Sequence, residues 1–242
     1  MTIVLHRFPL SHYSEKGRAL LDFKKLPFRI EEHQLGLPQL GIYRLSGQRK
    51  VPVIDDAGRI VADSTEIALY LEERYPEPHL LPADAAARRE VLELEARLDR
   101  WMGSYAPVVW FDWFVREQPE EVSRLLQVEV WGAGQGRLAA AAIRPLMRLS
   151  KARSIVKKSS ERTHTLLKEL CERLEKSPYL CGQSPSLADV AAAGLAFHLE
   201  FPKTRHLAIP DWEGVGVPGY ADAPEYARFF DWRRRFYAEQ LS

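Results

Sequence analysis

The sequence predicts a small α/β domain followed by a larger all-helical domain. In the first 76 residues, short apolar segments of strand length alternate with segments of helical spacing. From residue 84 onward the periodic segments all have the helical period. Pro76-Glu77-Pro78, with Pro82, separates the two parts and is typical of a linker. We therefore expect one domain at 1–76 and a second at 84–242.

The first domain is expected to have the order β-α-β-α-β-β-α. Its first strand is rich in β-branched and apolar residues, and its first helix has Ala19, Leu20 and Phe23 at helical spacing. Asp55-Asp56-Ala57-Gly58 predicts a hairpin turn. The expected elements are strand 2–8, helix 11–25, strand 28–31, a short helix or loop at 37–45, strands 51–54 and 59–62, and helix 64–75.

The second domain is expected to be helical throughout, although two prolines interrupt its pattern. Pro107 and Pro145 should kink or end their helices, because proline lacks the N–H that an interior helix position needs. The expected helices are 84–117, 119–131, 137–151, 155–176, 186–200 and 223–240.

Composition excludes several classes of protein. The net charge is +1, so no global field favours nucleic acid. No apolar run reaches the roughly 20 residues of a membrane span, and Met1–Pro9 does not have the pattern of a signal peptide. Only two cysteines, Cys171 and Cys181, are present. We therefore expect a cytoplasmic protein with reduced thiols.

Two short segments of the first domain point to a peptide-like ligand. Pro52 lies between two valines, where it cannot donate to a sheet ladder. A cis bond there would turn the backbone N–H and C=O of Val51 outward, available to a ligand. Asp63-Ser64 then opens a helix, so a carboxylate, a hydroxyl and free N–H groups meet. Such a point suits the ammonium and carboxylate of an amino acid.

These and one further motif give the chain a resemblance to the glutathione transferase superfamily. Val51-Pro52-Val53 resembles the family's cis-proline strand entry, and Asp63-Ser64-Thr65 with Ile67 resembles its acidic-Ser-x-x-Ile signature. Ser186-Leu187-Ala188-Asp189 resembles the capping box that opens a buried helix of the second domain. The resemblance implies a thioredoxin-like first domain, an all-helical second domain and glutathione as cosubstrate.

The resemblance also implies where glutathione would bind. The Val51 backbone, beside Pro52, would pair with the cysteinyl part of the tripeptide. Asp63 and Ser64 would hold the γ-glutamyl ammonium and carboxylate. The glycyl carboxylate would meet one of the two cations that precede Val51, Arg49 or Lys50.

Ser11 is the expected catalytic residue, since it matches the position of the family's serine or cysteine after the first strand. Its hydroxyl would donate to the glutathione thiolate, whose free thiol has a pKa of about 8.5. Ser11 could also be an ordinary helix N-cap, and the two roles are compatible. Ser14 is a rival hydroxyl and Tyr13 a weaker one. His12 replaces a proline common in relatives and is expected on the surface.

The family's second-substrate site implies a pocket for an apolar electrophile, lined from the second domain. Most of the aromatic residues near Pro107 are expected in the core, and some could line that pocket. Asp189 is expected to cap its helix, so that its replacement costs stability before chemistry. The aromatic candidates are Trp101, Tyr105, Trp110, Phe111, Trp113 and Phe114.

Other patterns are assigned no function. The seven histidines show no metal-ligand spacing, so no metal is expected. The basic stretch 137–158 could bind an anionic membrane or a protein partner, but a solvated helix face is preferred. The same interpretation is given to Arg233-Arg234-Arg235.

These observations predict a glutathione transferase, in which glutathione thiolate attacks an electrophilic carbon of a small molecule and forms a thioether. The resemblance implies a homodimer with a site in each chain, and a role in detoxification. Two alternatives stay open. One is a glutathione-dependent isomerase or dehalogenase, and the other is a binding or scaffold protein without turnover.

Overall fold

The first domain is built on a four-stranded sheet of order β2-β1-β3-β4. The computed structural model describes residues 2–33, 39–118, 120–121, 145, 149–207 and 210–241. β1 pairs in parallel with β2 and antiparallel with β3, which in turn pairs antiparallel with β4. The predicted strands are confirmed, with observed bounds Ile3–Arg7 (β1), Phe28–Glu32 (β2), Val53–Asp56 (β3) and Arg59–Ala62 (β4).

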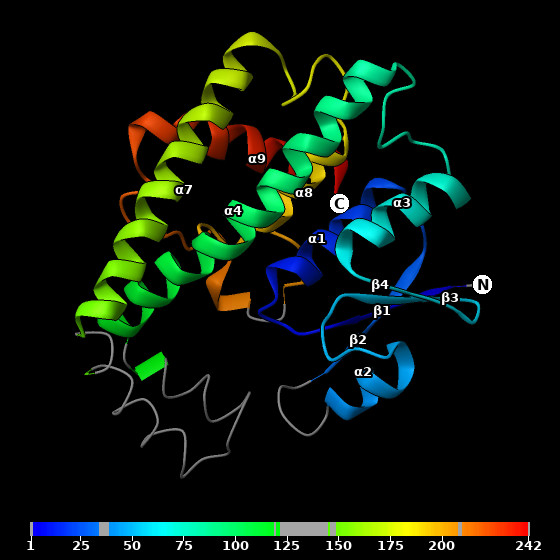
Figure 1. The fold of residues 1–242 in the computed structure, drawn as a ribbon, viewed down its shortest axis with the longest axis horizontal. Coiled ribbons are helices and arrows are strands. Elements are labelled where there is room, and N and C mark those ends of the chain that lie inside the picture. Colours follow the sequence, from blue (N-terminus) through cyan, green and yellow to red (C-terminus); the bar gives the residue numbers. More distant parts are fainter. Residues whose placement is uncertain are drawn as a thin grey trace.

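Helices cover both faces of this sheet (Figure 1). α1 (His12–Phe23) and α3 (Ser64–Arg74) lie on one face, and α2 (Gln39–Ser46) lies on the other. Leu5 and Ile54 point into the main core. Val4, Val53 and Ile42 are buried outside that cluster, because successive strand residues alternate between faces. The sequence left open whether 37–45 forms a helix or a loop, and the structure has a helix there that begins at residue 39.

The described part of the second domain is helical, as predicted. α4 continues through Pro107, so this proline does not end its helix. Most of the predicted helices 119–131 and 137–151 lies outside the described residues. No described helix is long and apolar enough to span a membrane. The α-helices are α4 (Ala85–Glu117), α7 (Ser150–Lys176), α8 (Leu187–Leu195) and α9 (Ala227–Gln240), with short 3₁₀ turns at Ala196–His198, Pro210–Trp212 and Pro224–Tyr226.

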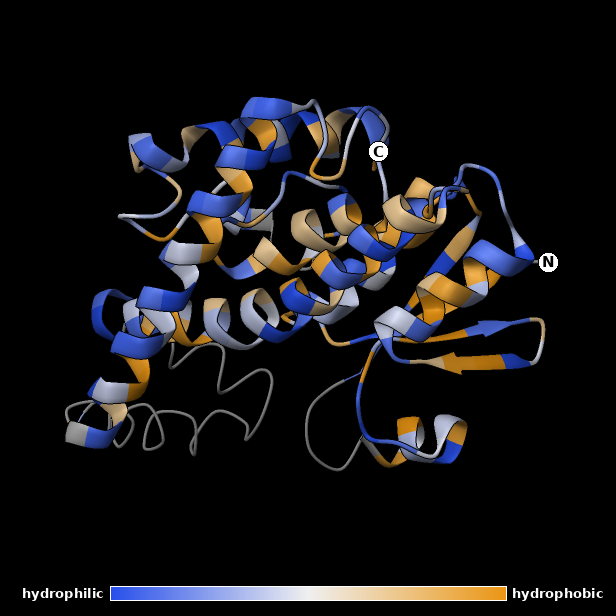
Figure 2. Ribbon diagram, turned by 45° about the horizontal axis from the view of Figure 1, so that its top comes forward, coloured by the Kyte–Doolittle hydropathy of each residue, from blue (hydrophilic) through white to orange (hydrophobic). Residues whose placement is uncertain are grey.

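The long helix α7 shows why these segments pack as they do. Figure 2 shows hydrophilic and hydrophobic residues alternating along it, as expected of a helix with one buried face. Leu166, Leu167 and Leu170 are fully buried, whereas Lys151 and Lys157 are exposed. The described part of the basic stretch is therefore a solvated face, as predicted.

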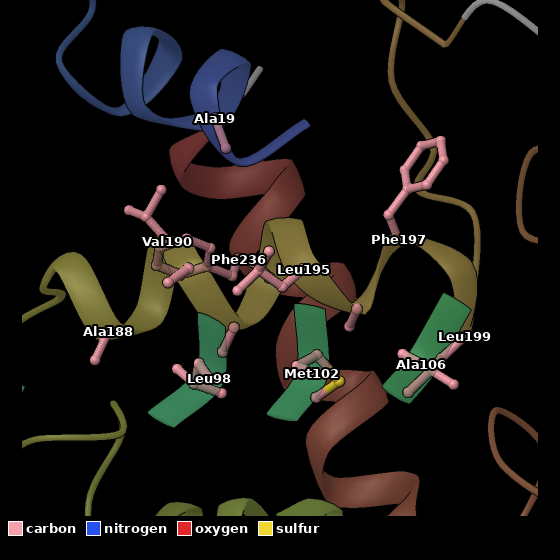
Figure 3. Close-up of a cluster of buried hydrophobic side chains, with 14 of the residues drawn as sticks. Ala19, Leu98, Met102, Ala106, Ala188, Val190, Leu195, Phe197, Leu199 and Phe236 are labelled. Atoms are coloured by element: carbon pink, nitrogen blue, oxygen red, sulfur yellow. The ribbon is translucent and has the colours of Figure 1, made fainter. Parts of the chain in front are cut away.

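The two domains share one core, and α8 lies at its centre. Figure 3 shows α8 between Ala19 of α1 on one side and Leu98, Met102 and Ala106 of α4 on the other. The helices approach closely because Gly194 lacks a side chain. A Cβ there would lie 2.7 Å from the Cα of Lys16, well inside van der Waals contact.

A buried ionic cluster also joins the domains. The Lys16 ammonium on α1 pairs with the carboxylate of Glu95 and lies 2.7 Å from Asp99 Oδ1, both on α4. Thr65 of α3 donates to Glu95 Oε1 at 2.6 Å. Lys16 is fully buried. Breaking such a pair leaves an uncompensated charge in the interior at a cost of about 3–5 kcal/mol, so the cluster holds the two domains in one arrangement.

The interpretation of Arg233 as part of a solvated helix face is wrong. Its side chain is buried, with 1% exposed, and its Nε donates to the carbonyl of Ala193 at 2.8 Å. The guanidinium also lies 4.9 Å from the ring centroid of Tyr237. Only Arg234 and Arg235 of the triplet face solvent, where Arg234 pairs with Glu200. Within the run of three arginines, Arg233 therefore packs against α8, which the run of like charges did not indicate.

Candidate functional site

The entry to β3 has the geometry predicted for the glutathione site. The Val51–Pro52 bond is cis, and the carbonyl of Pro52 accepts from the N–H of Asp63 at 3.3 Å. Neither the N–H nor the C=O of Val51 forms a backbone hydrogen bond within the described part of the chain. These two groups are therefore available to an extended peptide, as in strand addition.

Gly17 explains how Pro52 reaches helix α1. A Cβ on Gly17 would lie 2.9 Å from Cβ of Pro52 and 3.0 Å from its Cγ. A glycine within a helix costs about 1 kcal/mol relative to alanine. The close contact explains why glycine occupies this position despite the cost, because a larger side chain would collide with Pro52. The cis-proline segment can therefore pack directly against α1.

Asp63 forms the tip of α3 in an unusual backbone conformation. Its φ is 83° and its ψ is 135°, a sparsely populated region that costs about 1–3 kcal/mol and recurs at ligand sites. Oδ1 accepts from the N–H groups of Thr65 at 2.8 Å and Glu66 at 3.4 Å. Oδ2 accepts no hydrogen bond in the described part, and the residue is exposed. This oxygen is therefore free to accept from an ammonium group.

The other predicted binding residues fall on both sides of this tip. Ser64 is buried at the first position of α3, and its hydroxyl has no partner among the described residues. Arg49 and Lys50 are exposed just before Val51, and neither forms an ion pair in the described part of the chain. The structure thus places two cations next to Val51 that have no ion-pair partner among the described residues, and it does not choose between them.

Ser11 is the N-cap of α1 and is only partly buried. Its Oγ accepts from the N–H of Ser14 at 3.1 Å, and its carbonyl accepts from Glu15 at 2.9 Å. A hydroxyl that accepts in this way still has its own proton to donate. β1 pairs antiparallel with β3, and the last pair of this ladder is His6 with Val53. The loop that leads to Ser11 therefore leaves the sheet at the end where the cis-proline segment enters β3.

The two rival hydroxyls are occupied differently. Ser14 is buried, with 1% exposed, and its Oγ accepts from the N–H of Phe8 at 3.4 Å. The hydroxyl of Tyr13 donates to the carbonyl of Asp99 at 3.1 Å. Burial raises the pKa of Tyr13 to about 12. Gly103 makes room for this ring, since a Cβ there would lie 2.4 Å from the Tyr13 hydroxyl.

The expectation that His12 lies on the surface is wrong. Its ring packs 4.3 Å from that of Tyr13 and 5.1 Å from that of His198, and its Nε2 is buried without a partner. The carbonyl of Gly103 favours the protonated form of the ring, but burial has the larger effect on its pKa. Pro107, four residues later, has no N–H to occupy that carbonyl, which leaves it free to face the histidine.

The burial of His12 fixes its charge. Removal from water lowers the pKa of His12 to about 4, and lowers that of His198 well below its usual value. Both rings are therefore neutral at pH 7. Neither His12 nor His198 therefore offers a positive charge beside Ser11, and among the described residues the Ser11 hydroxyl and the N-terminus of α1 are the groups that favour an anion there.

The aromatic residues of α4 divide into core and partly exposed groups. Trp110 and Phe114 are buried and stack with ring centroids 4.8 Å apart, which confirms the core interpretation for these two. Trp101 lies under the guanidinium of Arg162 on α7. Phe111 is half-buried, and its ring centroid lies 6.5 Å from that of Trp110.

Comparison with known proteins identifies the family. A model described as the N-terminal domain of glutathione S-transferase matches residues 5–79, and one described as its C-terminal domain matches residues 137–215. The chain belongs to the glutathione transferase superfamily. The solved structure of a glutathione S-transferase from Rhodospirillum rubrum F11 has a TM-score of 0.68 at 21% identity, over 99% of this chain and 90% of that one. The predicted fold class is thereby confirmed.

Two curated relatives of this transferase-family chain differ in activity. Maleylpyruvate isomerase from Ralstonia sp is 35% identical over 95 residues, which are 38% of this chain and 45% of that protein. The probable glutathione S-transferase GSTU1 from Oryza sativa subsp. japonica is 30% identical over 163 residues, which are 56% of this chain and 68% of that protein. The chain thus spans about half the length of the isomerase and two thirds of that of the rice protein.

Two features of the site were missed from the sequence. The His12–His198 contact joins residues far apart in the chain, as does the pairing of Lys16 with Glu95. The spacing of these residues along the chain predicts neither contact. For the His12–His198 contact, the one sequence signal was Pro107 in an otherwise helical stretch, because a proline leaves the carbonyl four residues earlier without its backbone N–H donor.

Proposed function

We propose that this protein is a glutathione transferase that joins glutathione to a small apolar or aromatic electrophile. The thiolate sulfur attacks an electrophilic carbon, a carbon–sulfur bond forms, and the leaving group departs with its electron pair. The binding assignment is Val51 for the cysteinyl backbone, Asp63 and Ser64 for the γ-glutamyl end, and Arg49 or Lys50 for the glycyl carboxylate. Catalysis consists of placing the thiolate and lowering its pKa.

One observation carries this proposal: the Ser11 hydroxyl accepts a helix N–H and still has a proton to donate, at the N-terminus of α1. A hydrogen bond to a charged group contributes about 1.5–3 kcal/mol. Each pKa unit by which the thiol is lowered corresponds to about 1.4 kcal/mol. The hydroxyl alone can therefore lower the thiol pKa by about one to two units, which brings it near neutrality.

Exchanges at Ser11 test the assignment. Ser11→Gly removes the hydroxyl but changes capping by only a few tenths of a kcal/mol, whereas Ser11→Thr keeps a hydroxyl. We expect turnover with an aryl halide to fall about tenfold or more in Ser11→Gly, and to be largely retained in Ser11→Thr. Glutathione affinity, measured by calorimetry, should be nearly unchanged in both.

The matched comparison is Ser14→Ala. Because Ser14 is buried and its oxygen accepts from Phe8, this variant should lose some stability but keep the turnover of its folded fraction. A loss of turnover in Ser14→Ala without one in Ser11→Gly would show that the wrong hydroxyl is assigned. The pH dependence of thiolate absorbance in the glutathione complex would report the change in thiol pKa directly.

A glutathione-dependent isomerase is the second candidate, and the likeness to maleylpyruvate isomerase favours it. In such an enzyme glutathione would add to the substrate and leave again unchanged. Product analysis separates the two functions. A stable thioether with consumption of glutathione supports the transferase, whereas conversion of an unsaturated acid at constant glutathione supports the isomerase. Tight binding of glutathione with neither product supports a binding protein.

The remaining expectations are proposals as well. We infer a homodimer from the family, and sedimentation would show its mass. We also infer a cytoplasmic location, because both cysteines are free. Burial raises the pKa of the Cys181 thiol to about 12. A thiol with so high a pKa is neutral and unreactive, as expected for a packing residue.

A further inference from the structure

We propose that His6, Glu31 and His33 form a binding site for a divalent transition-metal ion on the first domain. His6 Nδ1 lies 2.9 Å from His33 Nε2. Glu31 Oε1 lies 3.8 Å from each of these nitrogens. One atom from each of two imidazoles and one carboxylate therefore lies within 4.8 Å of the other two. This donor set is one that zinc, cobalt and nickel ions bind in proteins.

The backbone holds the three residues in place. His6 and Glu31 are direct partners in the parallel pairing of β1 with β2. The N–H of His33 donates to the carbonyl of Arg7 at 2.8 Å, which continues the pairing one residue beyond the strand. Because side chains alternate along a strand, Glu31 and His33 lie on the same face as His6. The ligand set is therefore organised by the sheet.

The distances fit a metal ion with small adjustments. Two ligand atoms bound to one tetrahedral zinc ion at about 2.0–2.2 Å lie about 3.3–3.5 Å apart. The observed separations of 2.9 and 3.8 Å fall on both sides of this value. Shifts of about half an ångström, which side-chain rotation can supply, would bring all three atoms to bonding distance. Water would complete the coordination, as in open three-ligand sites.

The surroundings also suit a cation. The side chain of His6 is 9% exposed and that of His33 15% exposed, whereas that of Glu31 is 45% exposed, so an ion can enter from the side of the carboxylate. Arg29 contacts Oε2 of Glu31 at 3.4 Å, and leaves Oε1 facing the histidines. The Asp55 carboxylate adds a favourable field at His6, which the Arg29 charge opposes.

The proposed site is separate from the catalytic assignment and does not rest on it. His6 pairs across β1 and β3 with Val53, and its side chain lies on the face of the sheet that α2 covers. A metal ion there would fasten β1 to the end of β2. Binding to the folded chain alone raises its stability in proportion to the logarithm of metal concentration. We therefore assign the ion a stabilising role in the first domain.

Titration of the chelator-treated protein with zinc chloride, in buffer free of glutathione, tests the proposal. Calorimetry should show one equivalent bound per chain, and the melting temperature should rise with zinc concentration. The absorption spectrum of the cobalt complex should show nitrogen and oxygen ligands without a thiolate charge-transfer band. Glutathione is omitted because its thiolate is itself a zinc ligand.

Three variants make the test specific. Even loss of a residue that only supports a metal ligand costs about 10–100-fold in affinity, so His33→Ala should lose at least tenfold. Glu31→Gln, at a half-exposed position, should weaken binding while keeping the fold. The matched control is His79→Ala, since His79 directs its Nδ1 to Glu72 and its Nε2 to Glu77 and cannot hold one ion with both.

The outcomes decide the proposal. Loss of affinity in His33→Ala and Glu31→Gln, with His79→Ala unchanged, supports it. Equal zinc binding in all variants, or no saturable binding to the wild type, overturns it and leaves a hydrogen bond between two histidines. Glutathione affinity measured on the same variants should stay constant, so failure here would not be confused with failure of the proposed transferase function.

Discussion

Two helix tips in this protein use the same residue types for different ends. At the start of α8, Asp189 is fully buried, and its two oxygens accept from the N–H groups of Leu180 and Ser186 at 2.8 and 2.9 Å. At the start of α3, Asp63 is exposed and uses one oxygen only. The residue type alone does not separate these roles, which the family resemblance assigned in the sequence analysis. Burial and unused hydrogen-bonding capacity do, and they mark Asp63 as the tip that can receive a ligand.

The largest effect should come from the buried tip. Asp189→Ala leaves two buried N–H groups without acceptors, at about 1–3 kcal/mol each. We expect the free energy of unfolding to fall by about 2–5 kcal/mol, measured by denaturant titration. Asp84→Ala is the matched control, because Asp84 accepts from two N–H groups at the exposed start of α4 and should cost only about 0.5–2 kcal/mol. Equal losses of unfolding free energy in the two variants would contradict the larger structural role of the buried Asp189.

At the exposed tip the order of effects should reverse. Asp63→Asn keeps a capping oxygen and tolerates the positive φ, but removes the charge that would hold an ammonium. Because a hydrogen bond to a charged group is worth about 1.5–3 kcal/mol, glutathione affinity should fall about tenfold to a hundredfold in calorimetry. Stability should change by less than about 1 kcal/mol. Unchanged affinity would remove Asp63 from the proposed site, and Asp84→Asn provides the control.

The smallest expected effect concerns His12, beside the tip of α1. Its pKa is lowered to about 4 in the folded protein, so the unfolded chain binds more protons between about pH 4 and 6.5. Its contribution to stability is therefore present at neutral pH and is lost as pH falls through this window. His12→Phe, which keeps a ring but cannot titrate, should gain about 1–2 kcal/mol relative to the wild type on going from pH 6.5 to 5.

The difference between variant and wild type must be measured, because other groups titrate in the same window. Burial raises the pKa of Asp22 and Asp189 to about 6. Such carboxyls bind more protons when folded, so their contribution to stability falls as pH rises and opposes that of His12. Thermal melts of both proteins at each pH cancel these shared contributions. A constant difference across the window would mean that His12 is solvated.

Much of the fold could be predicted because its signals are local. Strand periodicity, the hairpin turn and the Asp63 and Asp189 caps each occupy a few adjacent residues. The position of Pro52 between two valines of a strand likewise suggested a cis bond. Failures arose where a contact joins distant positions. The burial of Arg233 depends on the carbonyl of Ala193, and that of His12 on the interruption of α4 by Pro107.

The same reasoning explains which parts of the site escaped the sequence. Asp63, Ser64 and Val51 belong to short motifs, so their proximity to Pro52 could be foreseen. His6 and His33 are separated by 27 positions and meet because of strand register. Regular spacing along a chain reveals ligands on one helix or turn, but not ligands on neighbouring parallel strands.

The Lys16 cluster makes the first 76 residues a poor candidate for independent existence. Without the carboxylates of Glu95 and Asp99, the Lys16 ammonium would keep Thr65 as its one hydrogen-bond partner among the described residues of the first domain. A fragment ending at the proline linker would have to bury an unpaired charge or open α1 to water. The first domain could therefore be combined with a different helical domain only if that domain supplied carboxylates at the positions of Glu95 and Asp99.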